Sequence, residues 1–314
     1  MDLPKLTNFD LKGKRVIVRA DLDINPTDLG NLRLTSLTPT LDYLKEQNCV
    51  ITIISHRGRP DGKLIESLSL KPFESYFAKW NAKVLENLRF NPGEGANDLE
   101  FAKELAKDQD FFVNESFATS HRAHASIVGL PKLLPHAAGL RFNLEVENLS
   151  RVLENPQKPS IIIISGVKED KVEMIKEIKD KIDKVLVGGR LPEYLGEDFK
   201  DEKVIVAKLN PDKEDITIHS IELFEDEISK AKTIVLAGVP GKYEEPGHRL
   251  GTERIFKKVA SSSAFKVVGG GDSLVVIASY ALEKDFNWIS VGGGAMLEFL
   301  AKGTLPGIIA LSEK

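Results

Sequence analysis

The chain has 314 residues, of which 42% are hydrophobic, 29% charged and 7% aromatic; such a composition is typical of water-soluble globular proteins and excludes disordered, fibrous and membrane classes. Its formal net charge of -4 provides no bulk positive field for nucleic acid, so an anion site would need a local cluster of arginine and lysine. The length suits about two domains, and two domains imply a cleft between them.

The cysteine content and the N-terminus indicate the cellular location. Cys49 is the single cysteine, which excludes an internal disulfide and is typical of a reducing cytosol. It lies in an apolar run, so we expect a small core residue rather than a nucleophile. The N-terminus has no signal-peptide pattern, and no apolar run approaches the roughly 18 residues of a membrane span. We therefore expect a cytoplasmic protein.

Short runs rich in valine and isoleucine alternate with amphipathic helical segments, a pattern typical of parallel strands joined by helical crossovers. The strands are almost continuously hydrophobic, which indicates that both faces of each sheet are covered. The sequence therefore predicts an α/β fold with doubly wound parallel sheets. The expected strands are residues 15–22, 49–56, 83–89, 111–116, 160–165, 184–189, 203–207, 233–238, 266–271 and 288–294. The expected helices are residues 36–47, 97–108, 168–182, 272–284 and 294–302.

A domain boundary is expected near the middle of the chain. Residues 142–154 read as a helix, and the turn-like segment "NPQKP" follows it before the next strand begins at Ser160. The helix would join the two domains.

Basic side chains follow several strands of the first half, at the point where each strand ends. His56 and Arg59 follow the second expected strand, Arg89 ends the third, and Arg122 follows the fourth. The carboxyl ends of parallel strands meet at one edge of a sheet, so these side chains should lie close together. Arginine forks match the oxygens of phosphate and carboxylate. The sequence predicts a basic pocket for a small polyanion, with Asp21 and Asp23 beside it.

The segment "SHRAHAS", residues 120–126, also allows a metal site, because His121 and His124 are spaced to share a helix face. The sequence offers no cysteine pair and no H-E-x-x-H motif to complete such a site, and neighbouring arginines would repel a divalent ion. The anion pocket is therefore favoured over a metal site, and an ordinary solvated loop is the third reading.

The second half contains two strand–glycine–helix transitions, "VVGGGDS" at 267–273 and "SVGGGAMLEF" at 290–299. Glycine lets the backbone approach a ligand closely, and a helix N-terminus offers unpaired N–H groups to phosphate. Neither segment is a Walker A loop or a dinucleotide G-x-G-x-x-G. Glycine can also serve turn geometry alone, but "VGG" at 187–189 and "AGVPG" at 237–241 repeat the feature and favour phosphate.

Three charged residues of the second half also suggest a phosphate site. Asp272 directly follows a glycine turn, where it could hold Mg²⁺ carried by a nucleotide, cap the helix, or do both. Lys168 and Lys171 open an expected helix three residues apart, on one face. They follow a strand directly, which would place them at the cleft.

Taken together, these residues resemble the phosphoglycerate kinase family. The segments "RVIVRADLDIN", "ISHRGRP", "LENLRF", "NESFATSHRAHAS", "VVGGGDS" and "VGGGAMLEFLAKGTLPG" are similar to its signature segments, in its order, from about Arg15 to Leu311. The resemblance implies two Rossmann-like domains separated by a cleft and joined by a helix hinge. It also implies a cytoplasmic, monomeric kinase that transfers a phosphoryl group reversibly between 1,3-bisphosphoglycerate and Mg-ADP, with Mg²⁺ as cofactor and no nucleic-acid or membrane partner.

The resemblance also implies roles for domains and residues. Residues 1–153 would bind the acid substrate, with 303–314 returning to them, and 154–302 would bind the nucleotide. The implied acid-binding residues are Asp21, Asp23, Arg33, His56, Arg59, Arg89 and Arg122. The implied nucleotide-binding residues are Lys168, Lys171, Gly188, Gly189, Gly238, Glu244, Gly269, Gly270, Gly271, Asp272 (also the metal ligand) and Ser273. The implied catalytic residues are Arg33, Lys168, Lys171, Gly271 and Gly294.

Several positions depart from the family pattern. The chain is shorter than usual, Asp23 replaces an asparagine, and the lysine segment reads "SGVKEDK" with its lysines one residue closer. Arg190 replaces a glycine, Ala237 replaces an asparagine, and the "DIGP" element is not recognisable in residues 214–227. Most of these differences from the family pattern lie among the residues expected to bind the nucleotide. They leave open a binding or regulatory protein without kinase activity, and a kinase with altered nucleotide preference.

Overall fold

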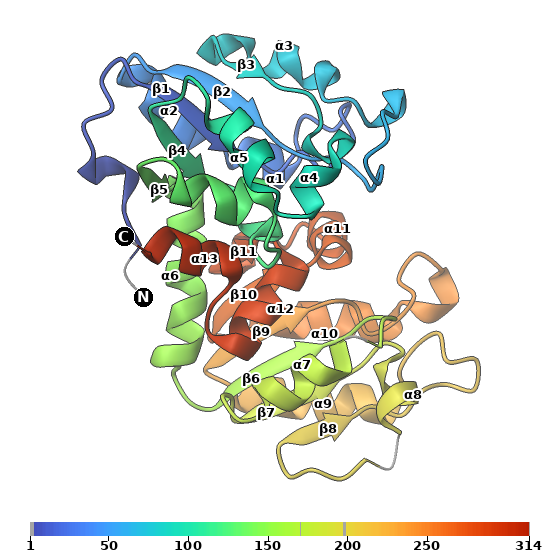
Figure 1. The fold of residues 1–314 in the computed structure, drawn as a ribbon. Helices are drawn as coiled ribbons and strands as arrows, with labels where there is room; N and C mark the ends of the chain where they lie inside the picture. The colour runs from blue at the N-terminus through green and yellow to red at the C-terminus, as the bar shows by residue number, and fades with distance from the viewer. Residues whose placement is uncertain (1–2, 170, 197–198, 314) are drawn as a thin grey trace. The chain divides into compact units, whose positions relative to one another are not determined.

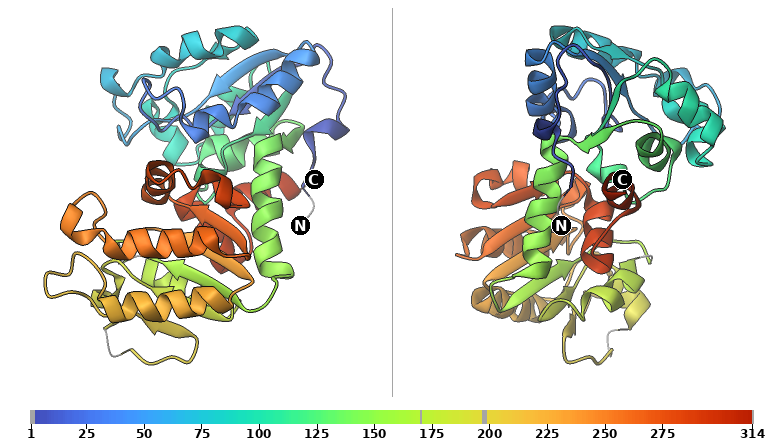
Figure 2. Two further views of the ribbon diagram at one scale, coloured as in Figure 1. Left: turned by 180° about the vertical axis from the view of Figure 1, so that it is seen from behind. Right: turned by 60° about the vertical axis from the view of Figure 1, so that its left-hand side comes forward.

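The computed structural model of the chain describes residues 3–169, 171–196 and 199–313. Its contacts divide the chain into two compact units. Unit 1 runs to Glu147 and includes the C-terminal segment from Thr304, and unit 2 is Asn148–Gly303. Figures 1 and 2 show a sheet with packed helices in each unit. The division lies inside helix α6, Leu140–Glu154.

Unit 1 is built on a parallel sheet of strand order β3-β2-β1-β4-β5. In its centre Val18 of β1 is in register with Ile53 of β2 and Val113 of β4. β5 was not predicted, because its short sequence "HAA" has no β-branched residue to mark it. The strands are β1 Arg15–Arg19, β2 Val50–Ile54, β3 Lys83–Val84, β4 Phe111–Asn114 and β5 His136–Ala138.

Helices cover unit 1's sheet because its strands are apolar on both sides. Val16 and Val18 pack with Leu41 and Leu44 of α2 in one core cluster. The alternate residue Ile17 points to the opposite face and is equally buried. The helices of this unit are α1 Leu32–Thr35, α2 Thr38–Glu46, α3 Glu74–Phe77, α4 Pro92–Gly95, α5 Leu99–Ala106, the first half of α6 (up to Glu147), and α13 Pro306–Ser312.

Unit 2 has a six-stranded parallel sheet of order β11-β10-β9-β6-β7-β8. Counted from its first strand, this is the order 3-2-1-4-5-6 read from the other edge, which is that of a Rossmann fold. The direction of winding reverses between β6 and β9, which pair directly along their length. The strands are β6 Ser160–Ile164, β7 Lys184–Val187, β8 Val204–Val206, β9 Thr233–Ala237, β10 Phe265–Gly269 and β11 Trp288–Ser290.

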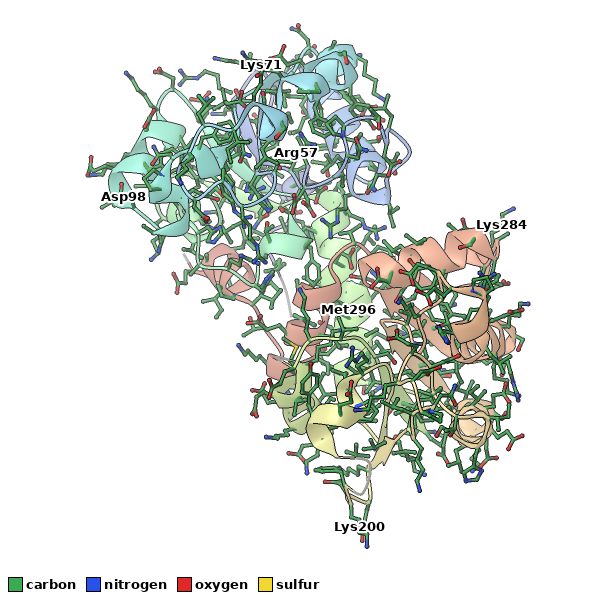
Figure 3. All side chains as sticks on the ribbon, turned by 90° about the vertical axis from the view of Figure 1, so that its right-hand side faces the viewer. Arg57, Lys71, Asp98, Lys200, Lys284 and Met296 are labelled. Atoms are coloured by element: carbon green, nitrogen blue, oxygen red, sulfur yellow. The ribbon has the colours of Figure 1, made fainter. Side chains whose placement is uncertain are left out.

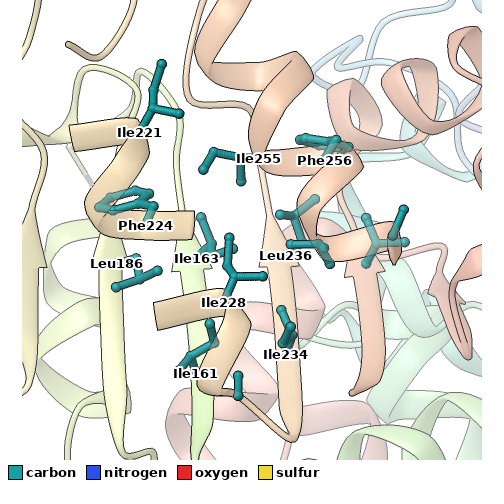
Figure 4. Packing of buried hydrophobic residues seen from close by; sticks show 14 of the residues in the cluster. Ile161, Ile163, Leu186, Ile221, Phe224, Ile228, Ile234, Leu236, Ile255 and Phe256 are labelled. Carbon is teal, nitrogen blue, oxygen red and sulfur yellow. The ribbon is translucent and has the colours of Figure 1, made fainter. Parts of the chain in front are cut away.

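The two longest helices within unit 2 cover one face of this sheet (Figure 4). Phe224 and Ile228 of α9 pack with Ile163 and Leu236 of the strands and with Phe256 of α10. Neither helix was predicted, although both carry apolar residues at helical spacing. The helices of unit 2 are α7 Lys171–Ile178, α8 Leu191–Leu195, α9 Ile218–Lys230, α10 Leu250–Ser261, α11 Gly271–Ser279 and α12 Gly293–Lys302.

The predicted fold class is confirmed: both units are α/β, with parallel sheets of the Rossmann type. Each of the ten expected strands contains a strand, but the third shrinks to Lys83–Val84. The helix expected from residue 168 begins only at Lys171, so Lys168 precedes it and the two lysines do not share a helix face. Cys49 is half-buried and packs against the core cluster of unit 1, and burial raises the pKa of its thiol to about 11.

Among the described residues, no single helix is long and apolar enough to cross a membrane. Helices α12 and α13 pass that test only when taken together. Most residues of α12 are buried in the protein, as expected of a core helix.

Candidate functional site

Unit 1 contains a cavity of about 560 Å³ beside the ends of its strands. Arg59, Arg89 and Arg122, each predicted from a different strand end, all line it. The carboxylate of Asp61 is the only acidic group among the lining residues found in the described part of the chain. The cavity therefore gathers arginine forks as a small polyanion requires. The lining residues are Arg59, Asp61, Gly62, Arg89, Asn91, Pro92, Gly95, Arg122 and His124.

Arg89 is fixed by the turn that carries it. The side chain of Asn87 accepts a hydrogen bond from the Arg89 backbone N–H at 3.1 Å, and the Arg89 guanidinium donates to the carbonyl of Gly58 at 2.6 Å. Burial and the nearby guanidinium of Arg122 lower the pKa of Arg89 to about 10. The group remains a cation at neutral pH, and partial desolvation strengthens its attraction for an anion.

Asp21, Asp23 and Arg33 form a second cluster at the end of β1. The Arg33 Nε lies 3.4 Å from the Asp21 carboxylate, and Arg33 also donates to the Asp23 carbonyl at 3.3 Å. The Asp23 side chain in turn accepts from the Gly58 N–H at 2.8 Å. The two carboxylates thus position Arg33 and the loop after β2. Arg33 is not among the residues that line the cavity.

His56 is held as a neutral imidazole with a defined tautomer. Its Nδ1 lies 3.0 Å from a guanidinium nitrogen of Arg19, and arginine only donates. Nδ1 must therefore accept, which leaves the proton on Nε2, 3.8 Å from the Asp23 carboxylate. Burial first, and then the charge of Arg19, hold the pKa of His56 well below its usual value. The Nε2–H is available as a neutral donor.

Sequence analysis missed Arg19 and Glu94, which are both fully buried. Arg19 donates to the Ser126 hydroxyl at 2.8 Å, and Glu94 accepts from the N–H and the hydroxyl of Ser126 at 3.0 and 2.7 Å. Together they hold the segment that carries Arg122. An arginine inside the apolar run "RVIVR" was the signal that could have indicated such a group.

The remaining arginine of "SHRGRP" serves the loop rather than the cavity. Arg57, labelled in Figure 3, donates to the carbonyls of Ile24 and Ser67 at 3.1 and 2.7 Å. The metal reading of "SHRAHAS" gains no support, because the described residues contain no group of three or more His, Cys, Asp or Glu side chains that could hold a metal. His124 instead faces the Glu94 carboxylate at 3.6 Å.

In unit 2, glycines let loops from neighbouring strands touch backbone to backbone. A Cβ on Gly238, whose φ is +98°, would lie 2.1 Å from the Ser165 carbonyl. A Cβ on Gly189, whose φ is +62°, would lie 2.5 Å from the Gly166 nitrogen. Lys171 donates from its ammonium to the Ser165 carbonyl. The ends of β6, β7 and β9 therefore meet at the switch point of the sheet, where Rossmann-type folds bind ligands.

The two GGG turns also meet each other. A Cβ on Gly293 would lie 2.6 Å from the Gly270 Cα, and one on Gly269 would meet the sulfur of Met296, labelled in Figure 3, at 2.7 Å. Ser273 accepts from the Gly238 N–H at 3.0 Å and joins these turns to the end of β9. Cβ atoms on Gly271 and Gly294 would meet nothing within 4 Å, so the first turns of α11 and α12 present open backbone.

The other expected nucleotide residues lie around these loops. Gly188 follows β7 directly, and a Cβ there would lie 2.8 Å from the Ser165 hydroxyl. Lys168 and Glu244 are exposed in loops. Asp272 is exposed in the first turn of α11, and the helix cap is Gly270, so the capping role expected for Asp272 is wrong. A single exposed carboxylate fits Mg²⁺, which commonly takes one or two protein carboxylates and the rest of its ligands from phosphate and water.

The structure places two of the residues that depart from the family pattern, Arg190 and Ala237. The Arg190 guanidinium pairs with Glu193 on α8 at 2.5 Å, and Lys213 pairs with the same carboxylate at 2.9 Å. Arg190 therefore faces its own helix. Ala237 is the last residue of β9 and is buried.

The arginine-lined cavity of unit 1 and the glycine-lined strand ends of unit 2 define a class of α/β protein suited to phosphorylated small molecules. The phosphoglycerate kinase family model matches residues 6–84, 77–197 and 194–303. The phosphoglycerate kinase of Dictyoglomus turgidum is 34% identical over 388 aligned residues, covering 98% of both chains. That of Thermosipho africanus is 33% identical over 397, covering 99% of both. These alignments exceed 314 residues, so the relatives contain segments that this chain lacks.

Solved structures agree with the sequence matches. Phosphoglycerate kinase from Coxiella burnetii superposes with a TM-score of 0.84 at 30% identity, covering 99% of both chains. The enzyme from Pyrococcus horikoshii gives 0.83 at 25% identity, covering 98% of both. The chain belongs to the phosphoglycerate kinase family, as its motifs indicated, and is an enzyme of the phosphotransferase class with a carboxyl acceptor.

Proposed function

We propose that the protein transfers a phosphoryl group reversibly between 1,3-bisphosphoglycerate and Mg-ADP, giving 3-phosphoglycerate and Mg-ATP. The observation that carries this proposal is the convergence of Arg59, Arg89 and Arg122, from three different loops, on one cavity of unit 1. Family membership supports the choice of this reaction. The proposal includes action as a monomer in the cytoplasm.

The acid substrate would bind in unit 1. Arg59, Arg89 and Arg122 would hold its phosphate or carboxylate oxygens, and the Nε2–H of His56 would add a neutral hydrogen bond. Arg33 would contact the transferring group, and Asp21 and Asp23 would hold Arg33 and the adjoining loop in place. Glu94 and Arg19 would hold the segment that carries Arg122 through Ser126 and would not touch the substrate.

The nucleotide would bind at the strand ends of unit 2. Lys168 and Lys171 would neutralise its phosphates, and the open amides at Gly271 and Gly294 would donate to them. Glu244 would hold the ribose hydroxyls and Asp272 the Mg²⁺. When bound with the nucleotide, Mg²⁺ would supply neutralisation of the phosphate charge. The other glycines of this site would let the backbone approach the nucleotide: Gly188, Gly189, Gly238, Gly269 and Gly270, with Ser273 holding the turn.

Little covalent help is needed for this reaction. Phosphoryl transfer passes through a loose transition state, so catalysis is positioning together with charge neutralisation. Arg33, the two lysines and the glycine amides would supply both. Direct in-line transfer requires the two ligands to meet, so we include closure about a hinge at α6 in the proposal. Closure would also exclude the water that hydrolyses an acyl phosphate.

A coupled assay of 3-phosphoglycerate with Mg-ATP tests the proposal. The wild-type protein should turn over, and Arg33→Ala should reduce kcat by roughly 10² to 10³, the effect of losing one charge-stabilising donor. Arg254→Ala is the matched control, because Arg254 lies on α10 and pairs with Glu225 on α9. Binding of 3-phosphoglycerate without turnover in the wild type would instead identify a catalytically silent binding protein.

The same assay with GTP in place of ATP, followed by calorimetry of ADP and GDP, tests nucleotide preference. Arg190 stands where the family has a glycine, and its guanidinium pairs with Glu193. The guanidinium is therefore held by its own helix and should not redirect nucleotide recognition, so we expect ADP to bind at least as tightly as GDP.

A further inference from the structure

Asp215 is a buried carboxylate that neither proposed binding site uses. It is 3% exposed and ends the short hairpin after β8, whose residues Leu209 and Ile216 form an antiparallel bridge. Its Oδ2 accepts from the N–H of Gly251 at 2.9 Å, and its Oδ1 accepts from the N–H of Ile216 at 2.8 Å. Burial raises the pKa of Asp215, and these two backbone bonds oppose that rise.

The segment 241–251 is shaped around this carboxylate. A Cβ on Gly241 or on Gly251 would lie 2.3 Å from the Asp215 Oδ1. Glycine at both positions therefore lets the backbone pass directly over the carboxylate. The two ends of the segment, ten residues apart in sequence, share one buried anchor.

Further contacts fix the segment on both sides. Towards the hairpin, Lys242 donates its N–H to the Glu214 carbonyl at 2.8 Å, and the His248 imidazole lies 3.2 Å from the Asp212 carboxylate. Towards α10, the Thr252 hydroxyl accepts from the Gly241 N–H at 3.0 Å and donates to the Gly241 carbonyl at 3.2 Å. The tip between these anchors contains exposed Glu244.

We propose that Asp215 is a positioning residue for nucleotide binding. It holds segment 241–251 against the hairpin 209–216 and thereby fixes the tip of the segment, which carries Glu244. This inference rests on the proposed function, because it assigns the segment the recognition of a ribose diol through Glu244. It also gives a role to the hairpin 209–216, which overlaps the segment where the family's "DIGP" element is not recognisable.

Asp215→Asn tests the inference. The amide has one oxygen and one NH₂ group, so only one of the two backbone N–H groups keeps its own acceptor oxygen. Without any ligand, hydrogen exchange of the amides in 241–251 should accelerate. In the coupled assay, KM for Mg-ATP should rise roughly tenfold, the effect of one lost hydrogen bond to a charged group, while kcat and KM for 3-phosphoglycerate stay near the wild-type values. Asp226→Asn is the control, since Asp226 is an exposed carboxylate on α9.

Thr252→Val attacks the same segment from the α10 side with no change of shape. It should show the same faster hydrogen exchange in 241–251 and the same higher KM for Mg-ATP. It therefore tests the inference even if Asp215→Asn does not fold. Unchanged exchange in 241–251, or an unchanged KM for Mg-ATP, in the folded variants would overturn the inference. A wild-type protein that binds no Mg-ADP in calorimetry would overturn the proposed function itself.

Discussion

Arg19 and Glu94 illustrate how buried charge organises the loops around the arginine-lined cavity of unit 1. An isolated charge inside a protein costs several kcal/mol. Here Arg19 donates to the Ser126 hydroxyl, Glu94 accepts from Ser126, and the two charges lie 3.9 Å apart. The same guanidinium donates to His56 and fixes its tautomer. The buried Arg19 therefore determines which nitrogen of His56 carries the hydrogen.

Glu115 is a second buried carboxylate, at the N-terminus of α6. It accepts from the Thr40 hydroxyl and from the backbone N–H groups of Arg141 and Phe142, the latter two at 3.0 and 2.8 Å. Burial dominates and raises its pKa to about 7, against about 4.3 in an unfolded chain. Between these values the folded state binds the extra proton, so this contribution to stability is complete below about pH 4 and is lost as pH rises through 7.

We predict that Glu115→Gln removes this pH dependence. The free energy of unfolding of the wild type, minus that of the variant, should fall by up to about 3 kcal/mol between pH 5 and pH 8. Urea unfolding followed by circular dichroism at both pH values measures this difference. A difference that is constant with pH, or that grows as pH rises, would show that Glu115 is not protonated in the folded protein.

At the scale of elements, neighbouring backbone limits which residues fit in the glycine turns before α11 and α12. Gly293 and Gly294 both lie in the first turn of α12, but only Gly293 has a close neighbour, the Gly270 backbone. Backbone atoms cannot move aside as a flexible side chain can. Alanine is otherwise favoured over glycine in a helix by about 1 kcal/mol.

We therefore predict opposite effects of the same substitution at adjacent positions. Gly293→Ala should lower the Tm by roughly 5 °C, since the turns before α11 and α12 must separate. Gly294→Ala should leave the Tm unchanged or raise it slightly. Differential scanning calorimetry compares the two, and equal Tm values would mean that the turns do not pack as described.

The sequence predicted elements well where the signal is local. Valine- and isoleucine-rich runs marked the strands, and glycine followed by an apolar helix marked α12. β5 was missed because three small or polar residues form a strand only beside β4. Glu94 and Asp215 were missed because their partners, Ser126 and Gly251, lie 32 and 36 residues away in the chain. Contacts of that range arise from tertiary packing, which no local pattern encodes.

At the scale of the whole molecule, each unit has its own parallel sheet and its own set of groups at the strand ends. Parallel sheets concentrate such groups at one edge, which is why residue types read from separate strand ends came together in the cavity of unit 1. We propose that the acid substrate binds unit 1 and that the nucleotide binds unit 2. Substitutions in one unit should then affect one ligand only.

Calorimetric titration of two variants with each ligand tests this division. Arg89→Gln should weaken binding of 3-phosphoglycerate by at least about tenfold and leave Mg-ADP binding unchanged. Lys171→Gln should weaken Mg-ADP binding and leave 3-phosphoglycerate binding unchanged. Each variant is the control for the other. Undiminished 3-phosphoglycerate binding in Arg89→Gln, or equal weakening of both ligands in either variant, would contradict the account.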